Sequence, residues 1–522
     1  MRHNVLRTIR QLSSFTSIAV IFSLRVWAQQ TAGQEVYRNL TLFSDVFNQV
    51  RTNYIENVPP TYLIESAIEG LLSSLDPHSS YLDSSRLRLF KGLSEGVVTD
   101  VGVELEVING YPFIVSMIDE SPAAKSTLIP GDILTKVDDT VTYGLPEVKL
   151  RLLLMGSKGS PVRLTIRKPV TNEEKVVTLL RDEISLKTVP ISVMLDQTTG
   201  YVRISRFGFT TAEEYRSAVG KLRDEGMKNL LLDLRSNPGG TMKSAQEILD
   251  MYAPKGDLIS RVAARKDVAN ETTYASDQHK EPNYSISVLI NGSSASAAEL
   301  VAGTLQDLDR ALIIGNRSFG KGLVQSLFFL SNRGALLMTT GKYYTASGRC
   351  LQRTYKGKRP LEYYMETFGP DSIPTEDSLR MSTKGGRTIF AGGGVFPDVP
   401  VRSLQLDLLR KIDHSGSAVQ WASTNLSRCV QGFKTFEKFQ KAFAVTDEMM
   451  NNFIAGCESN QLDTTELRQN SGILTVLLKS EVAALQWGRS AWILISKDID
   501  PIIQEAIRTI PKAQELMEKS KK

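Results

Sequence analysis

The sequence predicts an α+β protein of several domains, with a layered α/β core, an inserted β-rich domain and helical segments at both ends. Three observations lead to this prediction. The chain has 522 residues, which is too long for one ordinary domain. Between residues 97 and 182 apolar and polar residues alternate, as they do in strands. From residue 183 strand-like and helix-like segments follow one another, which is typical of layered α/β structure.

The composition excludes several classes of protein. Hydrophobic residues make up 41% and charged residues 23% of the chain, as in soluble globular proteins. The net charge is only +5 and no basic run is interleaved with aromatic residues, so we expect no nucleic-acid partner. The four histidines are scattered, and none stands at metal-ligand spacing to another His or to a Cys. We therefore predict neither a metal site nor a cofactor.

The cysteines give no disulfide framework, because there are only three of them: Cys350, Cys429 and Cys457. A bond between Cys429 and Cys457 in an oxidising compartment and three unpaired, buried thiols are both compatible with the sequence.

Residues 1–28 have the pattern of a secretory signal. Three arginines precede the short apolar stretch SFTSIAVIFSL, and Val26-Trp27-Ala28 follows it. The apolar stretch is too short to span a bilayer comfortably. We expect cleavage after Ala28 and export to the periplasm. The alternative is an uncleaved anchor that keeps the protein at the membrane, facing the periplasm.

Residues 35–96 are expected to form a helical subdomain. In YRNLTLFSDVFNQVRTNYI the apolar residues Leu40, Phe43, Val46, Phe47 and Val50 share one helical stripe. The pattern repeats in YLIESAIEGLLSSL and ends at LDPHSSYL, because Asp-Pro stops a helix.

The β-rich segment at residues 97–182 resembles a PDZ domain. The resemblance lies in SPAAKSTLIPGDILTKVDD, in which Ser-Pro-Ala starts a short helix and Pro-Gly-Asp leads into the next strand. It implies that a peptide carboxylate would bind at Val101, Gly102 and Val103. This loop departs from the family's glycine-rich pattern: Gly102 can offer its N–H, but Asp100 would repel a carboxylate unless it points away.

Residues 183–402 are expected to form the α/β core. Strand-like TGYVRISRF, KNLLLDLR, YSISVLI and RALIIG alternate with the helical segments TAEEYRSAVGKLRDEG, TMKSAQEILDMYA and SAAELVAGTLQDLD. Residues 352–391 are polar and indicate an insertion or long loop. Residues 403–522 carry helical stripes and are expected to form a helical domain, which would serve in homo-oligomerisation or bind an adaptor protein.

The stretch NGSSASAAE, residues 291–299, follows an apolar strand and enters a helix. The first N–H groups of a helix are unsatisfied and carry the positive end of its dipole. A serine at this turn can attack a carbonyl while those N–H groups hold the oxyanion. The same serines would also serve as ordinary helix caps.

A lysine between two glycines, Lys321, follows the next strand in GNRSFGKGLVQS. If it is pushed into the protein, loss of water lowers the pKa of its ammonium, and the neutral amine can take a proton from a serine. A turn with a solvated lysine is the alternative. The stretch lacks the Ser or Thr of a phosphate-binding loop, and His279, the nearest upstream histidine, lies in a polar segment.

Taken together, NGSSASAAELVAGTLQD, RSFGKGLVQ, LLLDLRSNPGG and YYTASGR closely resemble the carboxy-terminal processing, or tail-specific, serine proteases. These enzymes embed a PDZ domain and use a Ser/Lys dyad. The resemblance implies that Ser296 is the nucleophile, Lys321 the general base and Gln325 the residue that orients the base. It covers residues 40 to 402, and the α/β layering also resembles the crotonase-like fold of enoyl-CoA hydratases.

The oxyanion would be held by backbone N–H groups. Ala297 lies at the helix start and is one expected donor. The other, by resemblance, comes from the NPGG turn, from Gly239 or Gly240, where glycines allow close approach of backbone and substrate. Asp233 and Arg235 on the preceding strand are interpreted as structural ion partners.

The sequence therefore predicts an exported serine endopeptidase that cleaves proteins with apolar carboxy-terminal tails, near the membrane, with the PDZ domain recognising tails or gating the site. Two other functions stay open. One is a non-catalytic PDZ scaffold that binds peptides, and the other is a different acyl-transfer enzyme on the same core.

Overall fold

The computed structural model describes residues 34–520, except residues 109, 119, 169–172, 266–270, 277–283, 367–378, 403 and 460–461. The expected signal at residues 1–28 and His279 lie outside the described residues. The chain divides into two compact units, Met1–Leu75 and Asp76–Lys522. The α+β multidomain class predicted from the sequence is confirmed.

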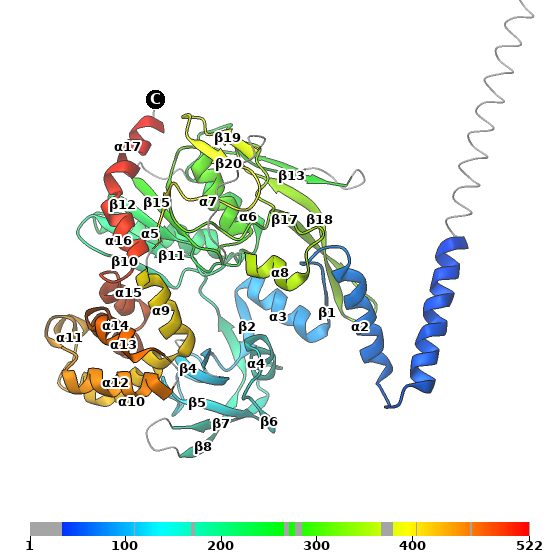
Figure 1. The fold of residues 1–522 in the computed structure, drawn as a ribbon, viewed down its shortest axis with the longest axis horizontal. Coiled ribbons are helices and arrows are strands. Elements are labelled where there is room, and N and C mark those ends of the chain that lie inside the picture. Colours follow the sequence, from blue (N-terminus) through cyan, green and yellow to red (C-terminus); the bar gives the residue numbers. More distant parts are fainter. Residues whose placement is uncertain are drawn as a thin grey trace, which may run out of the picture. The chain divides into compact units, whose positions relative to one another are not determined.

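The first unit contains a helix over residues 34–53, followed by α2 (Pro60–Ser73), both in dark blue in Figure 1. On the first helix the apolar stripe is largely exposed: Leu40, Phe43, Val46 and Val50 all face solvent. Among the described residues, no helix combines the length and apolarity needed to cross a bilayer.

The centre of the second unit is a six-stranded sheet, in which β10 is antiparallel to β11 and the remaining neighbours run parallel. The helices α5, α6 and α7 lie in the chain between its strands, which is the alternation expected from residue 183. In sheet order the strands are β10 (Ile191–Met194), β11 (Thr199–Arg203), β12 (Asn229–Asp233), β15 (Ser285–Ile290), β16 (Leu312–Gly315) and β21 (Val399–Pro400); the helices are α5 (Thr211–Asp224), α6 (Met242–Asp250) and α7 (Ala297–Asp307).

Both faces of this sheet are buried, because neighbouring residues of a strand point to opposite sides. Leu230 and Leu232 pack in the core that holds α5, α6 and α7, whereas Leu231 packs with apolar residues of the last helices. Those helices are α15 (Arg489–Ser496), α16 (Pro501–Arg508) and α17 (Ile510–Ser520). The last helices are therefore a third layer of the core, a contact that the prediction of a helical domain over residues 403–522 did not include.

A buried ion-pair network connects this layer to the sheet. Arg235 contacts Asp233 of β12 at 2.6 Å and Asp500, the N-cap of α16, at 2.7 Å. Burial alone would raise the pKa of the Asp233 carboxyl, but the guanidinium groups of Arg235 and Arg203 lower it to about 2. These contacts agree with the structural role expected for Asp233 and Arg235.

A second, antiparallel sheet joins residues far apart in the chain, because β18 pairs with β1, β13 and β17. Residues 76–96, which the sequence assigned to the N-terminal subdomain, thus belong to the second unit. The elements are β1 (Ser80–Leu82), α3 (Ser84–Glu95), β13 (Leu258–Ala264), β14 (Glu271–Tyr274), β17 (Leu323–Phe329) and β18 (Ala335–Tyr344); the polar insertion holds α8 (Pro360–Met365), β19 (Arg380–Ser382) and β20 (Thr388–Phe390).

The inserted β domain forms a sheet in the order β3-β4-β5-β7-β8, with β6 beside β5. The antiparallel pair of β2 and β9 brings the entry and exit of the domain together, from Val97 opposite Ser185 to Asp100 opposite Asp182. Its elements are β2 (Val97–Asp100), β3 (Val103–Ile108), β4 (Tyr111–Met117), β5 (Ile133–Val137), β6 (Thr140–Val141), α4 (Glu147–Leu154), β7 (Pro161–Arg167), β8 (Glu174–Leu180) and β9 (Asp182–Ser185).

The C-terminal helices share an apolar core of their own. Cys429 and Cys457 are buried in it as unpaired thiols, and Cys350 is also unpaired. Before α15 come α9 (Leu404–Ser415), α10 (Ser417–Val430), α11 (Phe436–Ala442), α12 (Asp447–Ser459), α13 (Thr464–Gln469) and α14 (Ser471–Trp487).

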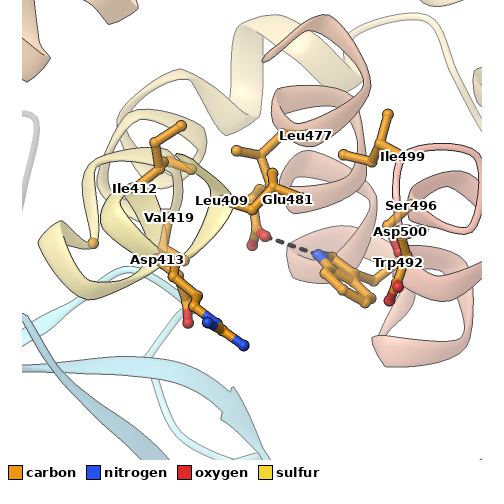
Figure 2. A pocket seen from close by; sticks show the side chains of 13 residues that line it. Leu409, Ile412, Asp413, Val419, Leu477, Glu481, Trp492, Ser496, Ile499 and Asp500 are labelled. Atoms are coloured by element: carbon orange, nitrogen blue, oxygen red, sulfur yellow. Dashed lines mark hydrogen bonds between the residues drawn. The ribbon is translucent and has the colours of Figure 1, made fainter. Parts of the chain in front are cut away.

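A pocket of about 230 Å³ lies among α9, α10, α14 and α15 (Figure 2). Its walls are mainly apolar, but Glu481 lies in it and accepts a hydrogen bond from Trp492 Nε1 at 2.8 Å. Burial raises the pKa of the Glu481 carboxyl to about 7, against the lowering effect of Arg489. The ionised form of this side chain is thus disfavoured in the folded state.

The raised pKa makes stability depend on pH in a defined direction. Below the ordinary glutamate pKa of about 4.3 the Glu481 carboxyl is protonated in both the folded and the unfolded state. As the pH rises toward about 7 only the unfolded state loses this proton, so the free energy of unfolding falls. At 1.36 kcal/mol per unit the loss is about 4 kcal/mol. We expect Glu481→Gln to exceed the unmodified protein in unfolding free energy by up to that amount at pH 8 and to equal it near pH 4. Urea unfolding followed by tryptophan fluorescence measures this, and an identical pH dependence of the two proteins would contradict it.

Candidate functional site

Ser296 lies at the N-terminus of α7, where the chain leaves β15 through a short turn. Its backbone angles are φ 56° and ψ −116°, which an L-residue adopts only under strain. Burial of the turn and the helix behind it holds this conformation. The side chain is partly exposed at the start of the helix, where unsatisfied N–H groups and the helix dipole favour negative charge. The neighbouring Ser294 is buried and donates to the Leu234 carbonyl at 2.8 Å, so its role is structural.

The glycine turn predicted to hold the oxyanion lies against this serine. A Cβ on Gly239 would come within 2.6 Å of Ser296 Cβ and 2.9 Å of the Ala297 nitrogen. Gly239 and Gly240 have φ of 94° and 140°, which glycine alone adopts readily. The sequence NPGG therefore brings two backbone segments together at the turn that carries Ser296.

The N–H groups of this turn differ in their partners. Gly239 donates to Asn237 Oδ1 at 2.8 Å. In contrast, the N–H groups of Ala297 and Gly240 form no hydrogen bond with another described residue. Of the three donors expected from the sequence, these two are thus available to an oxyanion.

Lys321 lies in the loop between β16 and β17, and its side chain is largely withdrawn from solvent. Burial lowers the pKa of its ammonium, while the negative charges of Glu299 and Asp76 act in the opposite direction. Desolvation is the larger effect, so the neutral amine is favoured more than in an ordinary lysine. Nζ donates to Gln325 Oε1 at 2.8 Å, and no described hydrogen bond joins Nζ to Ser296 Oγ.

Gln325 is held at its other end. Its Nε2 donates to the backbone carbonyl of His78 at 2.7 Å. Because a carbonyl oxygen only accepts, this contact fixes which end of the amide faces the lysine. Gln325 therefore presents an acceptor to Lys321 and holds the amine in one position.

The buried carboxylate of Glu299 connects the serine turn to the lysine loop. Its two oxygens accept the backbone N–H of Ser296 at 2.9 Å, of Gly320 at 2.6 Å and of Lys321 at 2.8 Å. The hydroxyl of Ser318 adds a fourth donor at 2.5 Å. Burial raises the pKa of the Glu299 carboxyl, while these four donors favour its charged form and act in the opposite direction.

Tyr343 of β18 makes a second connection, since its hydroxyl lies 2.9 Å from the Ser296 carbonyl and 2.8 Å from the Lys321 carbonyl. The sequence interpretation did not include Tyr343, Glu299 or the His78 carbonyl. The spacing of Ser296 and Glu299, three residues apart at a helix start, is the capping-box pattern and would have identified Glu299.

The predicted peptide-binding loop is closed in this structure. Gly102 donates its N–H to Asp100 Oδ1 at 2.6 Å, and its carbonyl accepts from the Ile118 N–H at 2.9 Å. The side chains of Val101 and Val103 are buried. Asp100 thus occupies the N–H that the sequence offered to a peptide carboxylate.

Comparison with known proteins gives three family matches. The model of peptidase family S41 matches residues 198–360, and one described as the activating protease CtpB N-terminal domain matches residues 17–86. A family of unknown function matches residues 413–488.

Individual relatives cover more of the chain. The carboxy-terminal-processing protease of Bartonella bacilliformis is 38% identical, over 70% of this chain and 86% of the relative. The carboxy-terminal processing protease CtpB of Bacillus subtilis is 30% identical, over 84% of this chain and 90% of the relative. A solved PDZ domain of a carboxy-terminal protease from Vibrio cholerae, in complex with peptide, is 29% identical at a TM-score of 0.17, over 17% of this chain and 99% of that one. This chain therefore belongs to the carboxy-terminal processing proteases of peptidase family S41.

Proposed function

We propose that the chain is an exported serine endopeptidase that cuts polypeptides near their carboxyl ends, with Ser296 as nucleophile and Lys321 as general base. The observation that carries the proposal is the arrangement of a strained, accessible serine and a desolvated lysine on two segments that share Glu299. A non-catalytic peptide-binding scaffold would have no use for this arrangement.

The reaction follows from the positions of these groups. The neutral amine of Lys321 takes the proton of Ser296 Oγ, and the oxygen attacks the peptide carbonyl. The N–H groups of Ala297 and Gly240 stabilise the negative charge that develops on the carbonyl oxygen. The ammonium of Lys321 then gives its proton to the leaving amine, and an acyl-enzyme remains. Lys321 next accepts a proton from water, which attacks the acyl group, and its ammonium then returns that proton to Ser296 Oγ as the acyl group leaves as a carboxylic acid.

The inserted domain is proposed to be a PDZ domain that binds the apolar tail of the substrate. β3 pairs only with β4 in its sheet, so its other edge can accept an added strand, and the buried α4 residues Leu150 and Leu154 lie behind it. The closed state of Gly102 means that tail binding competes with Asp100.

The roles of Ser296 and Lys321 are tested with purified residues 29–522 as the enzyme. The substrate is an unstructured protein with an apolar carboxy-terminal tail, and its cleavage is measured. Ser296→Ala and Lys321→Ala are each expected to lower kcat/KM by on the order of 10⁴-fold, because they remove the nucleophile or the base. Ser293→Ala is the matched control: its hydroxyl is exposed in the same turn and is expected to be dispensable. Unchanged cleavage by either dyad variant would exclude the proposal and would favour the scaffold or another chemistry.

Tail recognition is tested by replacing the residue that closes the loop. Asp100→Asn removes the charge that repels a terminal carboxylate, so KM for a substrate with a free apolar tail should fall several-fold, on the order of 1 kcal/mol of binding. A substrate whose tail ends in an amide is expected to show no change. Equal effects on both substrates would contradict carboxylate binding at Gly102.

The exposed helix over residues 34–53 supports a homo-oligomer. Apolar residues recur on it at alternating intervals of four and three, which is the seam of a coiled coil: Val36, Leu40, Phe43, Phe47 and Val50. We expect Phe43→Asp to lower the mass seen by sedimentation velocity to that of the monomer, whereas Asn48→Asp, away from the seam, leaves it unchanged. A monomeric unmodified protein would show that this stripe has another partner, such as an adaptor.

A further inference from the structure

The polar insertion contributes a short helix, α8, that lies against the segment carrying Pro77 and His78. The hydroxyl of Tyr363 is 3.0 Å from His78 Nε2, and the hydroxyl of Tyr364 donates to the Pro77 carbonyl at 2.8 Å. His78 is the residue whose carbonyl holds Gln325. Two side chains of the insertion thus contact the Pro77–His78 segment, whose carbonyl accepts the hydrogen bond from Gln325.

Aromatic packing closes the same region. The His78 ring lies 5.5 Å from Tyr363, 6.2 Å from Tyr364 and 6.1 Å from Phe319, all in edge-on geometry. Phe319 is two residues before Lys321, and Tyr363 is almost completely buried. The rings therefore help to keep water from the lysine loop.

The hydrogen bonds form a directed chain. Burial lowers the pKa of His78 to about 4, helped by the charge of Lys321, so its ring is neutral at ordinary pH. A neutral Nε2 that accepts from Tyr363 leaves the phenol oxygen free to accept from Gln352 Nε2 at 3.3 Å and from the side chain of Arg353. Gln352 in turn accepts the N–H of Gly322, the residue after the base, at 2.9 Å. The insertion is thereby linked to both sides of Lys321.

We propose that α8 is a positioning element for the base: Tyr363 and Tyr364 hold the Pro77–His78 segment, which orients Gln325 and, through it, Lys321. Tyr363 touches no reacting atom and acts through His78. The inference rests on the proposed function, because it assigns a further residue to that reaction.

The charged surroundings of Lys321 determine what the loss of this contact does. The negative charges of Glu299 and Asp76 raise the pKa of Lys321, and burial lowers it. His78 is neutral, and the charge of Arg353 acts on His78. Loosening the segment admits water and weakens the opposing effect. The pKa of Lys321 then rises, and the amine is less often neutral at a given pH.

Tyr363→Phe removes one hydroxyl and keeps the ring, so the packing is preserved. We expect kcat to fall about 10-fold with KM unchanged, since the base is misplaced rather than the substrate. The ascending limb of kcat/KM against pH is expected to move to higher pH. Tyr355→Phe is the matched control, because the Tyr355 hydroxyl makes no hydrogen bond to a described residue while its ring lies 6.4 Å from Tyr363.

A double-variant cycle with Gln325→Ala separates positioning from general damage. If Tyr363 acts through Gln325, Tyr363→Phe causes no further loss in the Gln325→Ala background. The inference would be overturned if Tyr363→Phe caused the same loss of kcat in both backgrounds. It would also be overturned if the pH profile of the single variant Tyr363→Phe were unshifted. If Gln325→Ala is too slow to follow, the pH profile decides by itself. Failure of the proposed function looks different: the unmodified protein would show no cleavage that depends on Ser296.

Discussion

The buried carboxylate of Glu299 is the contact on which the site depends. It accepts N–H groups from the serine turn and from the lysine loop. Together with the Tyr343 hydroxyl and the backbone bond from the Phe319 N–H to the Ser294 carbonyl, it holds these two segments side by side. It also has an electrostatic consequence, because its charge favours the ammonium of Lys321. In the proposed mechanism Lys321 can act as a base only because desolvation outweighs this attraction, so the carboxylate and the apolar cover must be considered together.

The fold supplies the rigid frame for these segments. The parallel sheet is covered by helices on both faces, and parallel strands end at one edge, where the turns after β12, β15 and β16 meet. This edge holds the glycine turn, the turn that carries Ser296 and the lysine loop. Arg235 joins the sheet to the last helical layer through Asp233 and Asp500, so the C-terminal helices stabilise the strand that leads into the glycine turn.

Much of the site could be predicted from sequence because its groups are local in the chain. Ser296 stands at a strand-to-helix turn, and Lys321 and Gln325 share one short stretch, which the pattern of residues reveals together with the family resemblance. The His78 carbonyl could not be predicted, since it comes from 247 residues away and involves no side chain.

The third layer was missed for a similar reason: a helical stripe indicates that one face is buried, but not against which surface. The sequence predicted that Asp100 would repel a peptide carboxylate unless it points away, while its hydrogen bond to Gly102 required coordinates.

The central claim is that the amine of Lys321 loses its proton more readily than an ordinary lysine does. NMR titration of the lysine side-chain nitrogens in Ser296→Ala measures this directly, with the signal assigned by its absence in a protein that also carries Lys321→Met. We expect a midpoint below the ordinary lysine value of about 10.4. A midpoint at or above that value would contradict it, because the attraction of Glu299 would then have overcome desolvation.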